Sequence, residues 1–239
     1  MFRKTKEMKE RRRAREAAKG PIDLSTEAGR KRANYELIWG DHGFLRMQFQ
    51  NLHQISPEMW RSNQPSPKQI EEHARVRGIK TIINLRGESP KGYYLLEKEA
   101  CEANGIDLVD FQVFSRDTPT REKIFAAKQV FETIKYPALM HCKSGADRAG
   151  MMAVLYKLLR EGTTIEEAQK QLSLKYLHVK HGKTGVLDAV FEVYAGFNER
   201  EPISFLDWVA NHYDRLAIKQ AFLDSGAAKF RIDDLLGRE

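Results

Sequence analysis

Cys142 and Arg148 are the residues of this sequence whose types and spacing most clearly support chemistry. They enclose the segment Lys143–Asp147, which follows a short apolar run and precedes a helical pattern. A loop between a strand end and a helix N-terminus presents backbone N–H groups and the positive end of a helix dipole, and both bind anions. Arg148 adds a planar guanidinium that can bind two phosphate oxygens. The same field favours a thiolate at Cys142, so the segment predicts a loop that binds a phosphate and attacks it.

The elements that position this loop follow from alternating apolar runs and helical patterns after Trp60. Ser66-Pro67-Lys68-Gln69 combines an N-cap serine, a proline at the first helical position and a glutamine at the third, which begins a helix. The patterns predict strands over residues 79–85, 106–114 and 138–141, and helices over 67–78, 92–103, 118–134, 148–162, 164–167 onward and 205–222. This alternation predicts an α/β fold with a central, mostly parallel sheet of about four to five strands flanked by helices.

The loop and its context resemble a known enzyme family. His141–Gly150, HCKSGADRAG, resembles the HCxxGxxR signature of the cysteine-dependent protein tyrosine and dual-specificity phosphatases. Trp60–Pro65 and Asn84–Glu88 are similar to segments that precede the loop in compact bacterial and fungal dual-specificity-like members. The similarity extends over residues 59–174. It implies a dual-specificity-phosphatase-like fold and hydrolysis of phosphomonoesters through a phosphocysteine intermediate, without a metal or cofactor.

The resemblance also implies roles for single residues. Cys142 is the expected nucleophile and Arg148 binds the phosphate. As structural interpretations of the residues themselves, we expect His141 to orient the loop, and Arg61 and Arg86 to have structural partners, with Arg86 close enough to support the loop. Relatives usually carry Ser or Thr directly after the loop arginine, but here that residue is Ala149. We therefore expect either slow release of the thiolate in the second step or partial compensation by Ser144. The expected substrate-binding residues are Lys143, Ser144, Gly145, Ala146, Ala149 and Gly150.

Two aspartates are candidates for the general acid. Relatives take the acid from a loop before the signature strand, which points to Asp117 in SRDTPT. Asp147 lies inside the loop, where some relatives also have aspartate. A carboxylate beside a bound phosphate dianion becomes more basic, as an acid working near neutral pH requires. We rank Asp117 slightly ahead of Asp147.

The substrate stays open at this stage. A deep binding loop would admit only aryl phosphates such as phosphotyrosine in a protein, whereas a shallow one would admit phosphoserine, a phospholipid or an inositol phosphate. Two other classes remain as alternatives. A rhodanese-like sulfurtransferase also has a catalytic cysteine in a strand-to-helix loop, although its loop is shorter. A phosphate-binding pseudoenzyme is suggested by Ala149.

The positive charge lies near the N-terminus. Residues 1–32 hold 12 Lys and Arg against 5 Asp and Glu, which equals the net charge of +7 for the whole chain. This predicts either a solubilising tail or attachment to an anionic membrane surface, and no nucleic-acid partner. We expect a flexible tail over 1–34, the phosphatase domain over 35–200, and a C-terminal helix and tail over 201–239. The expected location is the bacterial cytoplasm, with possible attachment to the inner membrane face.

The other cysteine, histidine and lysine side chains have plain structural explanations. Cys101, on a helical pattern, is expected in the core, with a redox partnership to Cys142 as the alternative. Two cysteines are too few for a disulfide framework, so a reducing compartment is expected. No His, Cys and carboxylate spacing is typical of zinc. A basic cluster either forms an approach for phosphorylated substrates or is scattered surface charge; its members are Lys175, His178, Lys180 and His181.

Overall fold

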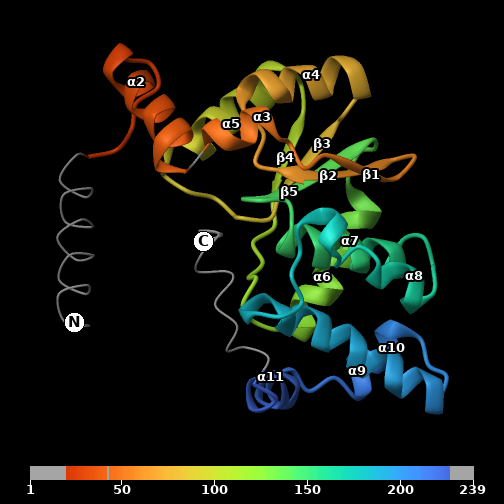
Figure 1. Cartoon of the computed structure of the whole chain (residues 1–239). Coiled ribbons are helices and arrows are strands. Elements are labelled where there is room, and N and C mark those ends of the chain that lie inside the picture. Colours follow the sequence, from red (N-terminus) through yellow and green to blue (C-terminus); the bar gives the residue numbers. More distant parts are fainter. Residues whose placement is uncertain (1–19, 42, 227–239) are drawn as a thin grey trace, which may run out of the picture.

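A computed structural model describes residues 20–41 and 43–226 of the chain. Two layers of helices enclose one sheet, with α2 to α5 above the strands and α6 to α11 below them in Figure 1. The strands are β1 (His53–Ser56), β2 (Met59–Asn63), β3 (Thr81–Asn84), β4 (Asp107–Asp110) and β5 (Ala138–Cys142). The helices are α2 (Glu27–Tyr35), α3 (Gly43–Gln48), α4 (Pro67–Arg77), α5 (Gly92–Ala103), α6 (Arg121–Thr133), α7 (Asp147–Leu159), α8 (Ile165–Gln169), α9 (Val186–Arg200), α10 (Phe205–Asn211) and α11 (Arg215–Asp224).

The sheet places β5, the strand that carries the candidate nucleophile, at its centre. Its five strands have the order β1-β2-β5-β3-β4, and only β1 runs antiparallel to its neighbour. Asn63 of β2 pairs with Cys142, and Asn84 of β3 pairs with His141. The carboxyl ends of three parallel strands therefore meet at the candidate loop. The predicted α/β class with a mostly parallel sheet is confirmed.

The core lies on both faces of this sheet because successive strand side chains point to opposite sides. Met140 and Ile83 face the larger cluster, which α6, α7 and α9 complete. Leu139 and Ile82 face a smaller cluster under α4 and α5. All five residues of β5 are buried, as expected for a central parallel strand. The loop that follows β5 is thus attached to a central strand whose side chains are all buried.

Several predicted boundaries are confirmed and two are wrong. The Ser66 capping box forms, and Gly78 ends α4 with a left-handed backbone conformation. The strand predicted over residues 106–114 ends at Asp110, opposite the end of its partner β3 at Asn84. The helix predicted over residues 205–222 is two helices. Asp214 separates them because its carboxylate caps α11, accepting from two backbone N–H groups of its first turn.

Part of the segment expected as a tail is helical. Helix α2 begins at Thr26, whose hydroxyl accepts from Gly29 N, and Arg30 pairs with Glu99 of α5 at 2.7 Å. Its buried Ala33 packs beside Leu96 of α5. Residues 1–19, with most of the basic charge, lie outside the described residues, so the domain division stays a prediction. None of the described helices is long and apolar enough to cross a membrane.

Candidate active site

The strand, loop and helix around Cys142 adopt the arrangement that the sequence predicts. Cys142 ends β5 and is 2% exposed, and α7 begins at Asp147. The backbone N–H of Gly145 donates to Cys142 Sγ at 3.2 Å, so the loop curls around the sulfur. No side chain caps the N-terminus of α7. Its first N–H groups are therefore available to an anion at the positive end of the helix.

Four consecutive carbonyl groups of the loop are held on its outer side. Their donors come from β2 and from the segments that flank it. The contacts are Gln64 N to the Lys143 oxygen at 3.4 Å, Asn51 Nδ2 to the Ser144 oxygen at 3.0 Å, and Arg61 Nη2 to the Gly145 and Ala146 oxygens at 2.8 Å each. Because a peptide group points its N–H opposite to its C=O, fixing the carbonyls outward leaves the N–H groups facing the sulfur side.

Gly145 is required by both conformation and space. Its φ of +75° lies in the left-handed region, which side chains with a Cβ rarely adopt. A Cβ there would lie 2.7 Å from the backbone of Ser62 and Asn63. These neighbours belong to β2 and cannot move independently of the sheet. The loop therefore reaches its curvature only with glycine at this position.

Arg61 is the main support of the loop; the sequence indicated structural partners for it but did not place it at the loop. Its side chain is fully buried on β2, and it also donates to the Gln171 carbonyl oxygen at 2.6 Å and lies 4.2 Å from the Tyr176 ring centroid. Burial lowers its pKa to about 10, partly offset by the negative charges of nearby groups, Cys142 first among them. An arginine in the middle of a buried strand was the available signal, since such a charge needs fixed partners.

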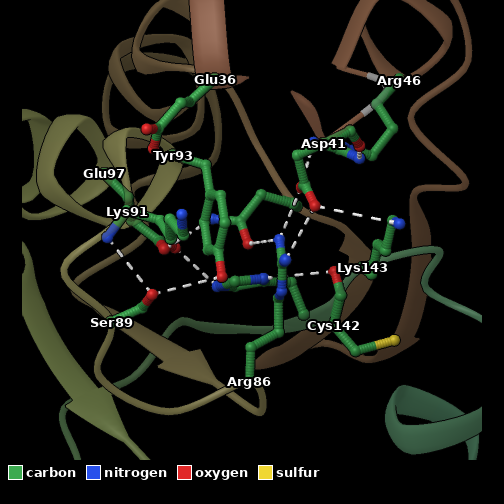
Figure 2. Close-up of polar contacts among 12 residues, drawn as sticks. Glu36, Asp41, Arg46, Arg86, Ser89, Lys91, Tyr93, Glu97, Cys142 and Lys143 are labelled. Carbon is green, nitrogen blue, oxygen red and sulfur yellow. Dashed lines mark hydrogen bonds and ion pairs between the residues drawn. The ribbon is translucent and has the colours of Figure 1, made fainter. Parts of the chain in front are cut away.

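Asp41 links Lys143 of the loop to two arginines, as Figure 2 shows. Arg86 binds both of its carboxylate oxygens, at 2.7 and 2.9 Å, and Arg46 binds one at 2.7 Å. Lys143 Nζ lies 3.9 Å from the same carboxylate. Burial lowers the pKa of Lys143, and although Asp41 raises it, the charges of both arginines and of Arg148 lower it further. Beside the loop, Asp41 is thus outnumbered by the cations Arg46, Arg86, Lys143 and Arg148, which favours the binding of an anion.

His141 contacts Glu97, which belongs to a buried chain of hydrogen bonds. Its Nε2 lies 2.6 Å from Glu97 Oε1, and the other oxygen of Glu97 accepts from Gln64 Nε2 at 2.6 Å. Gln64 in turn accepts from Arg86 at 2.8 Å. These contacts connect the strand before the cysteine with the arginine that binds Asp41. The structure thus places His141 and Arg86 in one network around the loop.

Asp147 is tied to a buried histidine and a second carboxylate. His178 Nδ1 lies 2.7 Å from Asp147 Oδ1, and His178 Nε2 lies 2.7 Å from Asp188 Oδ2 on α9. Burial lowers the pKa of His178, but the hydrogen bonds and charges of the two carboxylates outweigh it and raise that pKa to about 9. An imidazolium therefore connects the first residue of α7 to α9. His178 is fully buried, so its assignment to a basic surface cluster was wrong.

Asp117 lies in the loop before α6 and contacts α11. Arg215 Nη2 donates to Asp117 Oδ2 at 2.8 Å, and Lys219 Nζ donates to Oδ1 at 3.0 Å. Burial raises the pKa of Asp117, but the hydrogen bonds and charges of Lys219 and Arg215 outweigh it and lower that pKa overall. The contacts favour a carboxylate, not the protonated form that a general acid needs.

The other expected site residues lie in the loop or the first turn of α7. Lys143 and Ser144 are half-buried, Gly145 and Ala146 are buried, and Arg148 is half-buried ahead of the buried Ala149 and Gly150. Ala149 belongs to the core cluster. The hydroxyl of Ser144 accepts from Ala146 N at 3.4 Å. The expected substrate-binding residues are therefore contiguous around Cys142.

The second cysteine lies on the other side of the sheet. Cys101 packs in the smaller core cluster, whereas Cys142 belongs to the larger one, and both are free thiols. Burial raises the pKa of Cys101, which keeps it protonated. Over residues 20–41 and 43–226, no group of three His, Cys, Asp or Glu side chains could hold a metal ion.

Comparison with known proteins assigns the chain to a family. The family described as "DSP-PTPase phosphatase fused to NAD+ Kinase" matches residues 47–186, which include the loop and α7. The chain belongs to this DSP-PTPase phosphatase family. This membership agrees with the resemblance of its loop to the protein tyrosine and dual-specificity phosphatases. Helices α10 and α11 lie after the matched residues.

Individual relatives are more distant. The inositol diphosphatase DSP3 of Arabidopsis thaliana is 26% identical over 134 residues, which cover 53% of this chain and 64% of that protein. The match therefore spans less than two thirds of the curated relative. TpbA of P. aeruginosa is 16% identical in sequence, with a TM-score of 0.43 over 73% of this chain and 91% of TpbA. The catalytic core of the S. cerevisiae phosphatase SIW14 is also 16% identical, with a TM-score of 0.46 over 74% and 93%.

Proposed function

We propose that the chain hydrolyses phosphate monoesters through a covalent phosphocysteine at Cys142. The observation that carries this proposal is the loop whose carbonyl groups are bound outward by Arg61, Asn51 and Gln64. Its N–H groups are left for the sulfur and for the oxygens of a phosphate, as Gly145 N already shows toward Cys142. We expect the uncapped N-terminus of α7 and Arg148 to complete an anion site at the nucleophile.

The reaction runs in two displacements at phosphorus. In the first, the Cys142 thiolate forms an S–P bond while the P–O bond to the leaving group breaks, and a general acid gives its proton to the leaving oxygen. In the second, water attacks phosphorus, the S–P bond breaks and the thiolate returns, with the acid's carboxylate accepting a proton from that water. The amides and Arg148 stabilise the charge on the three remaining phosphate oxygens throughout.

We assign the general acid to Asp117 and a positioning role to Asp147. Asp147 is buried and its carboxyl group is bound by His178, so it is not free to turn toward a leaving group. Asp117 contacts partly exposed cations, so it can be released when substrate binds. This keeps the ranking made from the sequence and adds a physical reason for it.

Hydrolysis of a chromogenic aryl phosphate without added metal tests the proposal. We expect phosphate release by the unchanged protein and by Cys101→Ala, a matched cysteine variant on the opposite side of the sheet. We expect loss of release by Cys142→Ser. Equal release by Cys142→Ser would exclude the phosphocysteine. A thiosulfate-to-cyanide assay on the same preparations should be negative, because a positive result would instead support sulfur transfer.

Two substrate classes fit, and the leaving group separates them. A phosphorylated tyrosine, serine or threonine in a protein is the first candidate. The match to an inositol diphosphatase favours an inositol diphosphate as the second. In that case Cys142 takes the terminal phosphoryl group and the inositol phosphate leaves as a stable anion that needs little protonation, whereas an alkoxide needs the acid. Asp117→Asn should therefore slow hydrolysis of a phosphoserine peptide much more than hydrolysis of an inositol diphosphate.

The basic N-terminal segment supports a separate proposal of peripheral attachment to an anionic membrane, for a protein otherwise in the bacterial cytoplasm. The support is its charge, 12 Lys and Arg against 5 Asp and Glu over residues 1–32. Removing residues 1–19 should reduce sedimentation with phosphatidylglycerol vesicles at low salt, because surface attraction is screened by salt. Unchanged sedimentation would leave these residues as a solubilising tail.

A further inference from the structure

The loop that carries Asp117 is bound along its length by a segment of the C-terminal region. Here the acid loop denotes residues 115–120 and the C-terminal segment denotes residues 213–219. Besides the two cations on Asp117, the Thr118 hydroxyl donates to the Arg215 carbonyl oxygen at 3.1 Å. The Tyr213 hydroxyl donates to the Pro119 carbonyl oxygen at 2.7 Å. Both the side chain and the backbone of the acid loop are therefore held by the C-terminal segment.

The contacts at the carboxylate itself oppose proton donation. Oδ2 accepts from Arg215, while Oδ1 accepts from Lys219 and from the backbone N–H of Thr118 at 2.9 Å. A general acid must carry a proton on one oxygen and direct it to the leaving group. Each oxygen of Asp117 already faces at least one donor, so a proton has no favourable position. In this arrangement Asp117 is held as a carboxylate.

The same contacts are weak enough to be released. The side chains of Asp117, Arg215 and Lys219 are 34%, 33% and 36% exposed, so water competes for each ion pair. Arg215 and Lys219 are four residues apart and share one face of α11. Phe222 and Leu223, one turn further, line a cavity with Lys219. A small displacement of this one helix would therefore free Asp117 from both cations together.

We propose that Arg215 and Lys219, both on α11, are positioning residues that hold Asp117 as a carboxylate. Asp117 then donates its proton to the leaving group only after these two residues release it. This inference rests on the proposed phosphocysteine mechanism with Asp117 as acid. Helix α11 lies outside the residues matched by the phosphatase family. In this chain, the C-terminal region therefore controls whether Asp117 can take up and donate a proton. Anything that draws α11 from the acid loop would activate the enzyme toward poor leaving groups.

The pH dependence of kcat in an Arg215→Gln, Lys219→Gln double variant tests this. The high-pH limb of kcat marks loss of the acid's proton in the enzyme–substrate complex. Without the two cations Asp117 should hold its proton to higher pH, so the limb should move upward. Above the limb, the variant should then be faster by about tenfold for each pH unit of the movement. The gain should be larger for an alkyl phosphate than for p-nitrophenyl phosphate, whose leaving group needs little protonation.

Two comparisons keep the result interpretable. Lys128→Gln breaks a partly exposed ion pair with Glu132 on α6 and should leave the limb in place. Adding Asp117→Asn to the double variant should abolish the shift. An unmoved limb in the double variant, with activity still dependent on Cys142, overturns the positioning role while leaving the proposed function intact. A limb that moves downward, or a loss of kcat in a variant that unfolds at the usual urea concentration, also overturns it, because the cations would then assist the acid.

Discussion

Asp117 and Asp147 carry the same chemical group in very different surroundings. Asp147 begins α7 in the interior, and its partner His178 is buried between two carboxylates. Asp117 lies in a loop, and its partners Arg215 and Lys219 are about as exposed as it is. The Asp147 arrangement connects α7 to α9 through His178, while the Asp117 arrangement holds a loop that can be released. The role proposed for each carboxylate therefore follows from the groups that bind it.

The difference also separates the rigid from the adjustable parts of the site. The loop around Cys142 is fixed by buried donors such as Arg61. The proposed acid, Asp117, is instead held by α11, which lies at the edge of the molecule in Figure 1. A preformed anion site with a movable acid suits a reaction in which the phosphate binds first and the leaving group is then protonated.

Stability should show the largest contrast. Asp147→Ala leaves His178 buried with one carboxylate fewer, and removing one partner of a buried ion pair typically costs about 3–5 kcal/mol. Asp117→Ala removes only partly exposed ion pairs, worth about 0–1 kcal/mol. Urea denaturation of both variants measures the free energy of unfolding. Equal losses would show that the two aspartates do not differ as described.

Catalysis should show the reverse order. Asp117→Asn should lower kcat for an alkyl phosphate by roughly 100-fold, the lower range for loss of a general acid, and should flatten the high-pH limb. Asp147→Asn should keep that limb, because Asp147 donates no proton to the substrate. Steady-state kinetics from pH 5 to 9 compare them. A normal profile for Asp117→Asn together with a flat one for Asp147→Asn would reverse the assignment.

A smaller effect is expected in the dependence of stability on pH. The pKa of His178 is raised to about 9 in the folded protein, against 6.5 as the ordinary value. Its charge therefore stabilises the fold fully below pH 6.5, and this contribution disappears as pH rises through 9. The difference in unfolding free energy between the unchanged protein and His178→Asn should shrink over that range. A constant difference would mean that His178 is not charged between the carboxylates.

Local features of the sequence predicted the fold well. The Ser66 capping box and Gly78 act within one helix, so they could be recognised directly. The strand and helix on either side of the phosphate loop were predicted for the same reason, as was the candidate nucleophile between them. Membership of the family agrees with this part of the interpretation.

Contacts between distant segments account for what the sequence did not predict. His178 meets carboxylates 31 and 10 residues away, so nothing nearby marks it as buried. The break at Asp214 lies beside Tyr213, whose hydroxyl binds Pro119, 94 residues before it. Arg61 reaches carbonyl groups more than 80 residues later in the chain. Contacts of this kind depend on how whole helices and strands pack together, so no local sequence pattern predicts them.

Trapping the covalent intermediate tests the central claim most directly. The protein would be mixed with an aryl phosphate, quenched within milliseconds and digested for mass spectrometry. We expect a burst of phenolate equal to the enzyme concentration and one phosphoryl group on the peptide that contains Cys142. Ala149 in place of a hydroxyl residue should prolong this state. Steady turnover with an unmodified Cys142 peptide, or with the phosphoryl group on another residue, would contradict the account.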